Sequence, residues 1–315
     1  MAPRQFCFYV PWNRPAETRM SLAELDNRFP TMTEVRRALW HDMKPMYFDQ
    51  PRGSGGIDEV VETLILGRVN DCATFISGLG AATRVLERKP DSSPPRELDQ
   101  LDPSQVDTLV VLSFDHFKTE QTPSAGEVTW IRRFLNDPSK CVAICPHHDV
   151  GASGEYSELR AEFKHHGDPL VPPQDGVGGY ARALLRELGC PIENRFGLKA
   201  LTTTNGEPAE LIIDSDPNGF LKGVNTFTAH PHIPHLAIPD AVRAKVRVLA
   251  RQPVEGPVKD HPFFKDPKNG GALNALLQIE GFKGTLLVSD LTLWLGAADR
   301  GERSLHNFWG NMASM

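Results

Sequence analysis

Apolar and polar positions along the chain follow two spacings, which predict strands and helices in turn. Short, nearly continuous apolar runs at 5–10 (QFCFYV), 107–114 (DTLVVLSF) and 141–145 (CVAIC) are typical of strands that are buried on both faces. Residues 126–137 (GEVTWIRRFLND) instead place apolar side chains at helical spacing. The order of strand, helix and strand over 107–145 predicts a β-α-β unit with parallel strands.

The first hundred residues carry weaker patterns. Helical spacing predicts helices at 31–43 and 57–69, and MYFDQ at 46–50 predicts a short strand between them. Residues 71–89 (DCATFISGLGAATRVLERK) allow two interpretations: one helix interrupted by glycines, or a short strand, a glycine turn and a helix.

The second half of the chain predicts a helix, a hairpin and further strands. A helix over ALLRELGCP is expected to stop at Gly189 and Pro191, and Asn205-Gly206 indicates a β-hairpin within 199–214. The remaining expected elements are strands within 224–236, 244–252 and 285–290 and a C-terminal helix at 304–312.

These elements predict one α/β domain over residues 1–315. The expected architecture is a three-layer, open, mostly parallel sheet of the flavodoxin type with a β-hairpin elaboration. The Pro-, Ser- and charge-rich stretch at 89–105 is a surface connection and the best internal boundary, although it is a soft one.

Composition narrows the classes of function. A formal net charge of -6 without a Lys/Arg cluster argues against a nucleic-acid partner. No segment has the roughly eighteen apolar residues that a membrane span needs, and no signal-peptide core is evident, so we expect a cytoplasmic protein. Five cysteines without paired spacing fit a reducing compartment. Homo-oligomerisation stays open.

Reactive side chains follow the two central strands of the predicted sheet. Ligands of open parallel sheets bind beyond the carboxyl ends of the strands, so groups that end adjacent strands converge on one crevice. Ser113, Asp115 and His116 follow the first strand, and Cys145, His147, His148 and Asp149 follow the second. Cys141 and Cys145 should point to the same side of their strand.

The stretches VDTLVVLSFD, KCVAICPHHDVGA, LKGVNTF, GTLLVSDLTLW and LHNFWGN together resemble the class I glutamine amidotransferase-like superfamily, especially its ThuA-like and related branches. The likeness covers roughly residues 105–310. It implies the open sheet described above, and it implies that Cys145 and His148 match the Cys and His of a G-x-C-x-G-H-Q pattern. His230-Pro231 is similar to the start of the family's His-Pro-Glu.

The chain departs from the glutaminase pattern at three positions. Ala143 and His147 stand where the flanking glycines of the nucleophile are expected, and His232 stands where the Glu of His-Pro-Glu is expected. A tight turn at a nucleophile needs small neighbours, and the carboxylate that orients the base is absent. The departures argue against release of ammonia from glutamine.

Histidines gather in three segments that end or edge predicted strands. These are His116, His147, His148, His230, His232 and His235. Neutral imidazole is a common ligand of divalent transition metals such as Zn, Fe or Mn, and a carboxylate can complete or orient such a set. The expected metal ligands are His147, His148, Asp149, His230 and His232.

The leading prediction is a small-molecule hydrolase in which this His/Asp cluster, with a metal or as general base, activates water. The candidate catalytic residues of this prediction and its alternatives are Asp115, His116, His148 and Cys145, and under the leading prediction Cys145 is a neighbour rather than the attacking group. Two alternatives stay open: a covalent mechanism that uses Cys145 as nucleophile, with His148 or His230 as its base, and a ligand-binding domain without catalysis.

No nucleotide cofactor is expected. GLGAAT at 78–83 matches only the start of a dinucleotide-binding fingerprint, because its last glycine is missing, and a glycine-containing helix join explains it better. Asp290, which ends the strand within 285–290, either orients a histidine or caps the next turn, and the cap is favoured.

Overall fold

The computed structural model of the chain describes residues 3–18, 66–93, 95–116, 119–146, 178–206, 208–227, 233–290 and 303–315. The helix expected at 31–43, the strand at 46–50 and most of the helix at 57–69 lie outside these residues.

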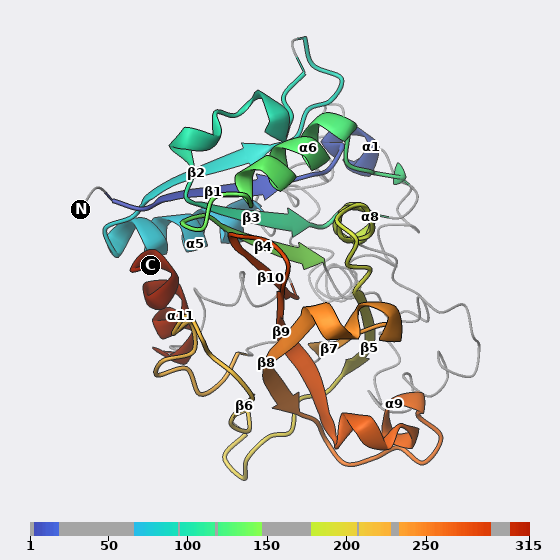
Figure 1. Ribbon diagram of the computed structural model, residues 1–315. Helices are drawn as coiled ribbons and strands as arrows, with labels where there is room; N and C mark the ends of the chain where they lie inside the picture. Colours follow the sequence, from blue (N-terminus) through green and yellow to red (C-terminus); the bar gives the residue numbers. More distant parts are fainter. Residues whose placement is uncertain are drawn as a thin grey trace, which may run out of the picture.

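One eight-stranded sheet organises the molecule (Figure 1). Its order across the sheet is β2, β1, β3, β4, β10, β9, β8 and β6. In chain order these are β1 (Gln5–Val10), β2 (Ala82–Glu87), β3 (Thr108–Ser113), β4 (Cys141–Pro146), β6 (Ile212–Ile213), β8 (Val246–Pro253), β9 (Ala272–Ile279) and β10 (Thr285–Ser289). The strands from β2 to β10 pair in parallel, whereas β9, β8 and β6 extend the sheet with antiparallel pairs. The chain is therefore an α/β protein with a mostly parallel sheet.

A two-stranded sheet lies beside the antiparallel part. Strands β5 (Glu193–Leu198) and β7 (Ile233–Ala237) pair with each other, and the side chain of Asn274 in β9 donates a hydrogen bond to the carbonyl of Leu236 in β7 at 2.9 Å. This bond ties the small sheet to the large one.

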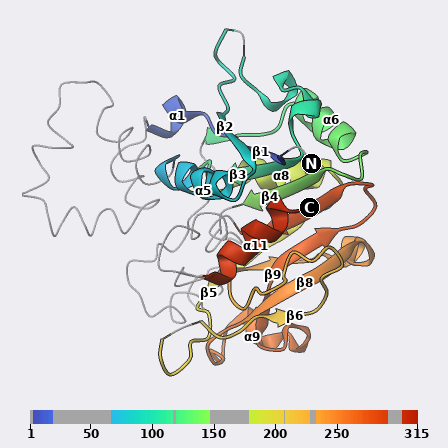
Figure 2. The same ribbon diagram turned by 90° about the vertical axis from the view of Figure 1, so that its left-hand side faces the viewer.

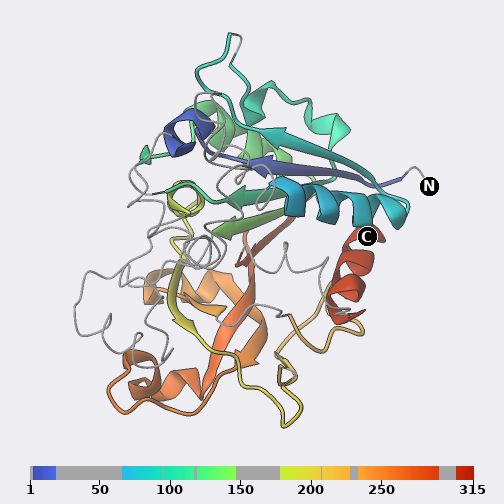
Figure 3. The ribbon, with the colours of Figure 1, turned by 180° about the vertical axis from the view of Figure 1, so that it is seen from behind.

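Helices cover both faces of the parallel strands. The described helices are α1 (Arg14–Thr18), α5 (Gly67–Gly78), α6 (Ala125–Phe134), α8 (Gly179–Glu187), α9 (Pro262–Lys265) and α11 (Arg303–Ala313), with 3-10 turns η3 (Leu98–Gln100), η4 (Pro103–Gln105), η6 (Asp240–Lys245) and η7 (Pro267–Asn269). Figure 1 shows α6 and α8 in front of the sheet, and the view from behind in Figure 3 shows α5 and α11 on the opposite face.

Two hydrophobic clusters fill the space between the sheet and these helices. Alternate residues of β4 divide between them: Cys141, Ala143 and Cys145 belong to the cluster under α5 and α11, and Val142 and Ile144 belong to the cluster under α6 and α8. The prediction that Cys141 and Cys145 share one side is confirmed. Burial on both faces is why the runs at 107–114 and 141–145 are almost entirely apolar.

The helix α6 begins with a capping box. The hydroxyl of Ser124 accepts a hydrogen bond from the backbone N–H of Glu127, and the Glu127 carboxylate accepts one from the Ser124 N–H at 2.8 Å. These bonds satisfy two backbone donors at the helix start, which is why the helix begins here.

Residues 81–89 form no helix, contrary to both interpretations of 71–89. The chain continues from α5 through a turn at Gly80, whose φ is +92°, into the strand β2, which pairs in parallel with β1. Thr83 and Val85 are β-branched, and pairing with β1 decides the conformation of a segment whose local preference is weak.

The predicted hairpin around Asn205-Gly206 is reduced to one bridge among the described residues. Thr202 bridges Pro208 in antiparallel fashion and Gly206 adopts a φ of +80°, as the turn requires. The apolar residues that follow, Ile212 and Ile213, pair with β8 instead. Strands β5 and β9 were not predicted, whereas β8 and β10 confirm the strands expected at 244–252 and 285–290.

The two ends of the described chain lie close together, away from the carboxyl ends of the parallel strands (Figures 1 and 2). The guanidinium of Arg4 donates a hydrogen bond to the carbonyl of Met315 at 3.2 Å. Among the described residues, no helix is long and apolar enough to cross a bilayer.

Candidate functional site

The carboxyl ends of β1 and β3 mark the point where strand order reverses. From β1 the chain passes to β2 on one side, and it then returns to β3 on the other side. Open α/β sheets bind ligands outside such a switch point, because the connections leave the edge in opposite directions and a crevice opens between them. The side chains that follow these strands therefore define the candidate site.

Asp115 and Ser113, at the end of β3, bind the first turn of α8. The Ser113 hydroxyl donates to Asp115 Oδ1 at 2.5 Å and accepts from the Ala181 N–H at 3.0 Å, while Asp115 Oδ2 accepts from the Tyr180 N–H at 2.8 Å. The positive end of the helix dipole stabilises a carboxylate placed there. The pair fixes α8 against the carboxyl end of the sheet.

A glycine pair makes this close approach feasible. Gly178, the N-cap of α8, has a φ of +80° and donates its N–H to the Asp115 carbonyl at 2.8 Å. A Cβ on Gly179 would lie 3.1 Å from Asp115 Oδ2. The pair Gly178-Gly179 directly before an amphipathic helix is the feature of the sequence that could have indicated this contact.

Burial raises the pKa of Asp115 to about 6, and the neighbouring Glu17 carboxylate raises it further, against the lowering effect of the bonds from Ser113 and Tyr180 and of Arg182. The side chain is fully buried. A carboxyl with a pKa close to neutrality can exchange a proton at physiological pH, as a general acid or base must.

Glu17 joins α1, which follows β1, to the end of β3. Its Oε1 accepts hydrogen bonds from the His116 N–H at 3.1 Å and from the Thr119 hydroxyl at 2.7 Å. Both Glu17 and His116 are buried. The structure thus brings Asp115 and His116, which the sequence predicted, together with Glu17, which it did not.

A second buried polar network lies nearby, between β1, β2 and α6. The Tyr9 hydroxyl donates to the Glu127 carboxylate, and Arg88 forms ion pairs with Glu97 at 2.7 Å and with Glu127 at 3.3 Å. The Arg88 guanidinium also lies 5.4 Å from the centre of the Tyr180 ring. This network joins β1, the end of β2 and α6.

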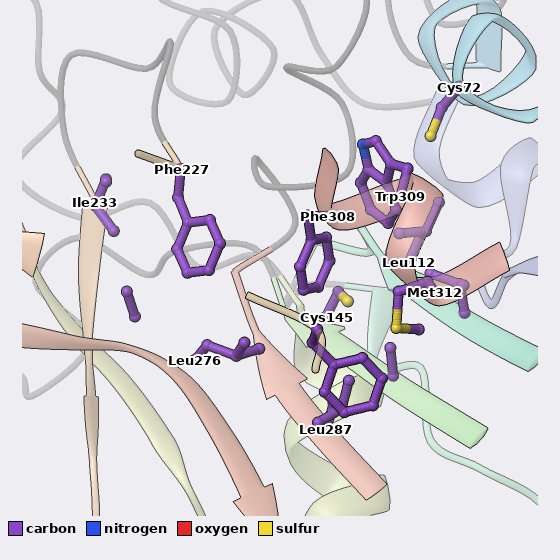
Figure 4. Close-up of a cluster of buried hydrophobic side chains, with 14 of the residues drawn as sticks. Cys72, Leu112, Cys145, Phe227, Ile233, Leu276, Leu287, Phe308, Trp309 and Met312 are labelled. Atoms are coloured by element: carbon purple, nitrogen blue, oxygen red, sulfur yellow. The ribbon is translucent and has the colours of Figure 1, made fainter. Parts of the chain in front are cut away.

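Cys145 lies in the hydrophobic core. Figure 4 shows its thiol among Leu112, Leu287 and Phe308, and its exposure is 0%. Its Sγ lies 3.4 Å from the Ser289 hydroxyl oxygen on β10. Attack by this thiol on a substrate would require the end of β4 to separate from the cluster.

The expected metal ligands His147, His148, Asp149, His230 and His232 lie outside the described residues. Within the described ranges, no group of three His, Cys, Asp or Glu side chains is arranged to hold a metal ion. His147 directly follows Pro146, which pairs with Ser113 across β3 and β4.

The attachment points of the AHPHIPH segment lie near the same cluster as Cys145. Phe227 and Ile233, which flank residues 228–232, both belong to the hydrophobic cluster that contains Cys145 (Figure 4). The described residues next to both histidine segments therefore pack in the same hydrophobic cluster.

His235 and Asp290 occupy separate places. Asp290 is buried just beyond β10. His235, on β7, accepts a hydrogen bond at Nδ1 from the Asn274 N–H on β9 at 3.1 Å, and its ring lies 5.2 Å from that of Phe263. His235 thus belongs to the antiparallel part of the molecule.

No protein-family model and no curated protein matches the chain. Among solved structures, it is similar to exo-beta-1,4-mannosidase Op5Man5 from Opitutaceae bacterium strain TAV5, at a TM-score of 0.37 and 12% sequence identity, with 100% of this chain covered. The chain spans 36% of the length of that protein. A likeness at this level carries no argument about activity.

Proposed function

We propose that the chain is a small-molecule hydrolase whose site lies beyond the carboxyl ends of β1, β3 and β4. The observation that carries the proposal is the pair of buried carboxyl side chains, Glu17 and Asp115, at the point where strand order reverses, with the backbone N–H of His116 bound to Glu17. Buried acids in such a position are typical of catalytic groups.

The proposal includes a flavodoxin-type, amidotransferase-like sheet, and the strand order supports this part of it. The parallel strands follow the order β2, β1, β3, β4 and β10, which corresponds to the 2-1-3-4-5 order of flavodoxin-type sheets. Fold alone does not define an activity, so the chemistry rests on the side chains.

In the proposed reaction, the end of β3 opens to water, because Asp115 is fully buried in the structure described. Asp115 then takes a proton from water as the water oxygen attacks a carbonyl or similar carbon of the substrate, and it returns the proton to the leaving group as the bond to that group breaks. Its raised pKa suits this exchange near neutral pH, and its bonds from Ser113 and Tyr180 fix the carboxylate in one orientation. The Glu17 carboxylate lies close enough to Asp115 to raise its pKa, and it accepts the backbone N–H of His116. The substrate class is a small molecule with a hydrolysable bond.

A divalent metal such as Zn, Fe or Mn belongs to the proposal through the histidine segments. Imidazoles of His147, His148, His230 and His232 with the Asp149 carboxylate match the ligands that these metals take, and a bound metal would supply an activated water. The support is that Cys145, Phe227 and Ile233, which stand next to the histidine segments in the sequence, belong to one hydrophobic cluster.

Elemental analysis of protein purified without an affinity tag tests the metal. We expect about one transition-metal ion per chain, lost in the His148→Ala variant together with hydrolysis of a panel of nitrophenyl esters and amides. His166→Ala is the matched control, because His166 lies outside the three segments that carry the expected ligands, and it should retain both.

An Asp115→Asn variant tests the acid-base role separately. It should retain the metal but lose hydrolysis, since the amide cannot accept the proton.

Full metal content and activity in His148→Ala would contradict the metal site. If activity survives chelation and is lost in Cys145→Ser, the covalent mechanism replaces the proposal. If every form of the protein binds substrate analogues and none turns them over, the ligand-binding domain replaces it.

A further inference from the structure

A pocket of about 570 Å³ lies in the antiparallel part of the molecule, between the β5–β7 sheet, strands β8 and β9 and the helix α9. Its volume falls within the range of small-molecule sites, about 300–1,000 Å³. Glu17, Asp115 and His116 of the proposed hydrolase site lie outside its described lining. The pocket is therefore a second place where this chain can bind a ligand.

The backbone around the pocket is held in a fixed conformation. Phe196 adopts a φ of +56° at the bulge where the pairing of β5 with β7 shifts, and such strained positions cluster at ligand sites. The Phe263 N–H donates to His261 Nδ1 at 3.1 Å, and the Phe263 carbonyl accepts from Asn269 Nδ2 at 2.9 Å. Walls that are fixed before a ligand arrives lower the entropy cost of binding.

The charges around the pocket are balanced. Each arginine of the described lining lies beside a carboxylate: Arg251 binds Asp214 with two bonds of 2.7 and 2.8 Å, Arg243 lies 3.1 Å from Asp240, and Arg195 lies 4.0 Å from Glu193. The other charged residues of this lining, Lys268 and Asp266, have opposite signs. Among the described residues, the lining and its ion-pair partners thus carry equal numbers of cations and carboxylates.

A balanced lining favours a neutral ligand. A charged ligand would lose its hydration on entering, and its attraction to one member of each ion pair would be offset by repulsion from the other. The imidazole of His235 does not disturb the balance, because burial lowers its pKa to about 4; the Arg195 charge lowers it further and Asp266 opposes this. The ring is therefore neutral at physiological pH.

The polar groups of the lining include both donors and acceptors. His235 Nδ1 accepts from the Asn274 N–H at 3.1 Å, so the proton of the neutral ring lies on Nε2. The ion pair of Arg251 with Asp214 places N–H groups and carboxylate oxygens side by side. A hydroxyl both donates and accepts, so a ligand with several hydroxyls matches such a lining.

Aromatic rings form the apolar part of the wall. The rings of Phe196 and Phe263 meet edge to face at 6.4 Å, and the His235 ring lies 5.2 Å from that of Phe263. The face of an aromatic ring carries partial negative charge, which attracts the C–H groups of a saturated ring. A pyranose combines the two features that the lining requires, because its C–H groups form an apolar face and its hydroxyls surround the edge.

We propose that this pocket binds a neutral sugar ring, whose apolar face lies against Phe196 and Phe263. Its hydroxyls bond to the Nε2–H of His235 and to the ion pair of Arg251 with Asp214. A charged sugar of the same size binds more weakly, because the lining offers no net charge of the opposite sign.

Ligand-observed NMR titration with neutral and charged probes tests the class of ligand. Methyl β-glucopyranoside and methyl β-galactopyranoside are the neutral sugars, and we expect at least one of them to bind with a millimolar Kd. The uronide of the sugar that binds adds one carboxylate and should bind at least about tenfold more weakly. Cyclohexanol, which has a saturated ring but a single hydroxyl, should not bind detectably.

The Asp214→Asn variant tests the charge balance. It leaves Arg251 beside an amide, so the lining gains one net positive charge, and the preference for the neutral sugar over its uronide should fall at least about tenfold. Glu280→Gln is the matched control, because it removes the carboxylate partner of Arg247, which lies on the same strand as Arg251 but outside the described lining. The control should keep the preference of the wild type.

The Phe263→Leu variant tests the apolar wall. It removes the ring and should weaken binding of the neutral sugar about three- to tenfold. Thermal unfolding of every variant separates lost binding from lost folding. Binding of neither neutral sugar, tighter binding of the uronide than of its neutral parent by the wild type, or an unchanged preference in Asp214→Asn would overturn the proposal.

Discussion

Asp115 shows how one side chain serves both the fold and the proposed chemistry. Its carboxylate receives the first turn of α8, yet it lies out of water beside Glu17, so its pKa rises to about 6. An acid whose pKa is raised on folding favours the folded state below its unfolded pKa, near 3.8, and that contribution is lost as pH rises through 6. The position that suits catalysis therefore costs stability at neutral pH.

The Asp115→Asn variant should become more stable relative to the wild type as pH rises from 4 to 7. The expected change in the difference of unfolding free energies over this range is about 2 kcal/mol, because one pKa unit corresponds to about 1.4 kcal/mol and part of the effect of the shift from 3.8 to about 6 is already lost at pH 4. An amide keeps the geometry, with its oxygen toward the Tyr180 N–H and its NH₂ toward Ser113. Urea unfolding at a series of pH values measures the difference.

The test uses the difference between variant and wild type, because His235 changes the stability of both with pH in the opposite direction to Asp115. Its pKa is lowered to about 4 on folding, so its contribution is lost as pH falls from 6.5 toward 4, over the same range. A difference curve that is flat between pH 4 and 7 would mean that Asp115 does not titrate as a buried acid.

At the scale of elements, the sequence predicted the strands that are buried on both faces, because such strands consist almost entirely of apolar residues. The apolar runs that became β1, β3 and β4 have no other stable place than the centre of a sheet. By contrast, β9 (ALNALLQI) is rich in residues that favour helices, and its conformation depends on pairing with β8 and β10. Local patterns cannot contain that information.

The residues of the candidate site also divide into those that the sequence predicted and those that only the fold brings together. Asp115 and His116 were predicted because they directly follow a recognisable strand, and parallel strands end at one edge. Glu17 was missed because its partner His116 lies 99 residues further along the chain, and only the pairing of β1 with β3 brings them together. The histidine segments remain a prediction from sequence.

Two glycines provide a test of how elements pack. A Cβ on Gly284, just before β10, would lie 2.7 Å from the Asp137 carbonyl oxygen and 2.9 Å from that of Lys140, whereas a Cβ on Gly310 in α11 meets no atom within 4 Å. Gly284→Ala should therefore destabilise the protein by about 1–3 kcal/mol. Gly310→Ala should stabilise it by about 0.5–1 kcal/mol, because alanine favours the helix.

Chemical denaturation of both variants at one pH gives the two differences. Equal effects of the two substitutions would mean that the turn before β10 can move away from the Asp137–Lys140 loop, and the close packing at the amino end of β10 would then not limit this position.

At the scale of the whole molecule, β10 joins two differently built halves. It pairs in parallel with β4 through Leu287 and Ala143, and in antiparallel fashion with β9 through Leu287 and Gln278. The Leu287 side chain is fully buried in the cluster of Figure 4, which also contains Leu276 of β9 and Phe308 of α11. One hydrogen-bonded sheet and one core thus continue across the junction.

Because the two halves share this strand and this cluster, we expect them to unfold as one unit. Leu287→Ala removes buried methyl groups at the junction and should lower the free energy of unfolding by about 2–5 kcal/mol. Hydrogen exchange measured by mass spectrometry should then show the same loss of protection in peptides from β3 and β4 as in peptides from β8 and β9. Leu201→Ser, at a residue that is 41% exposed, should leave both sets unchanged. Loss of protection confined to one set would show that the parallel and antiparallel halves open independently.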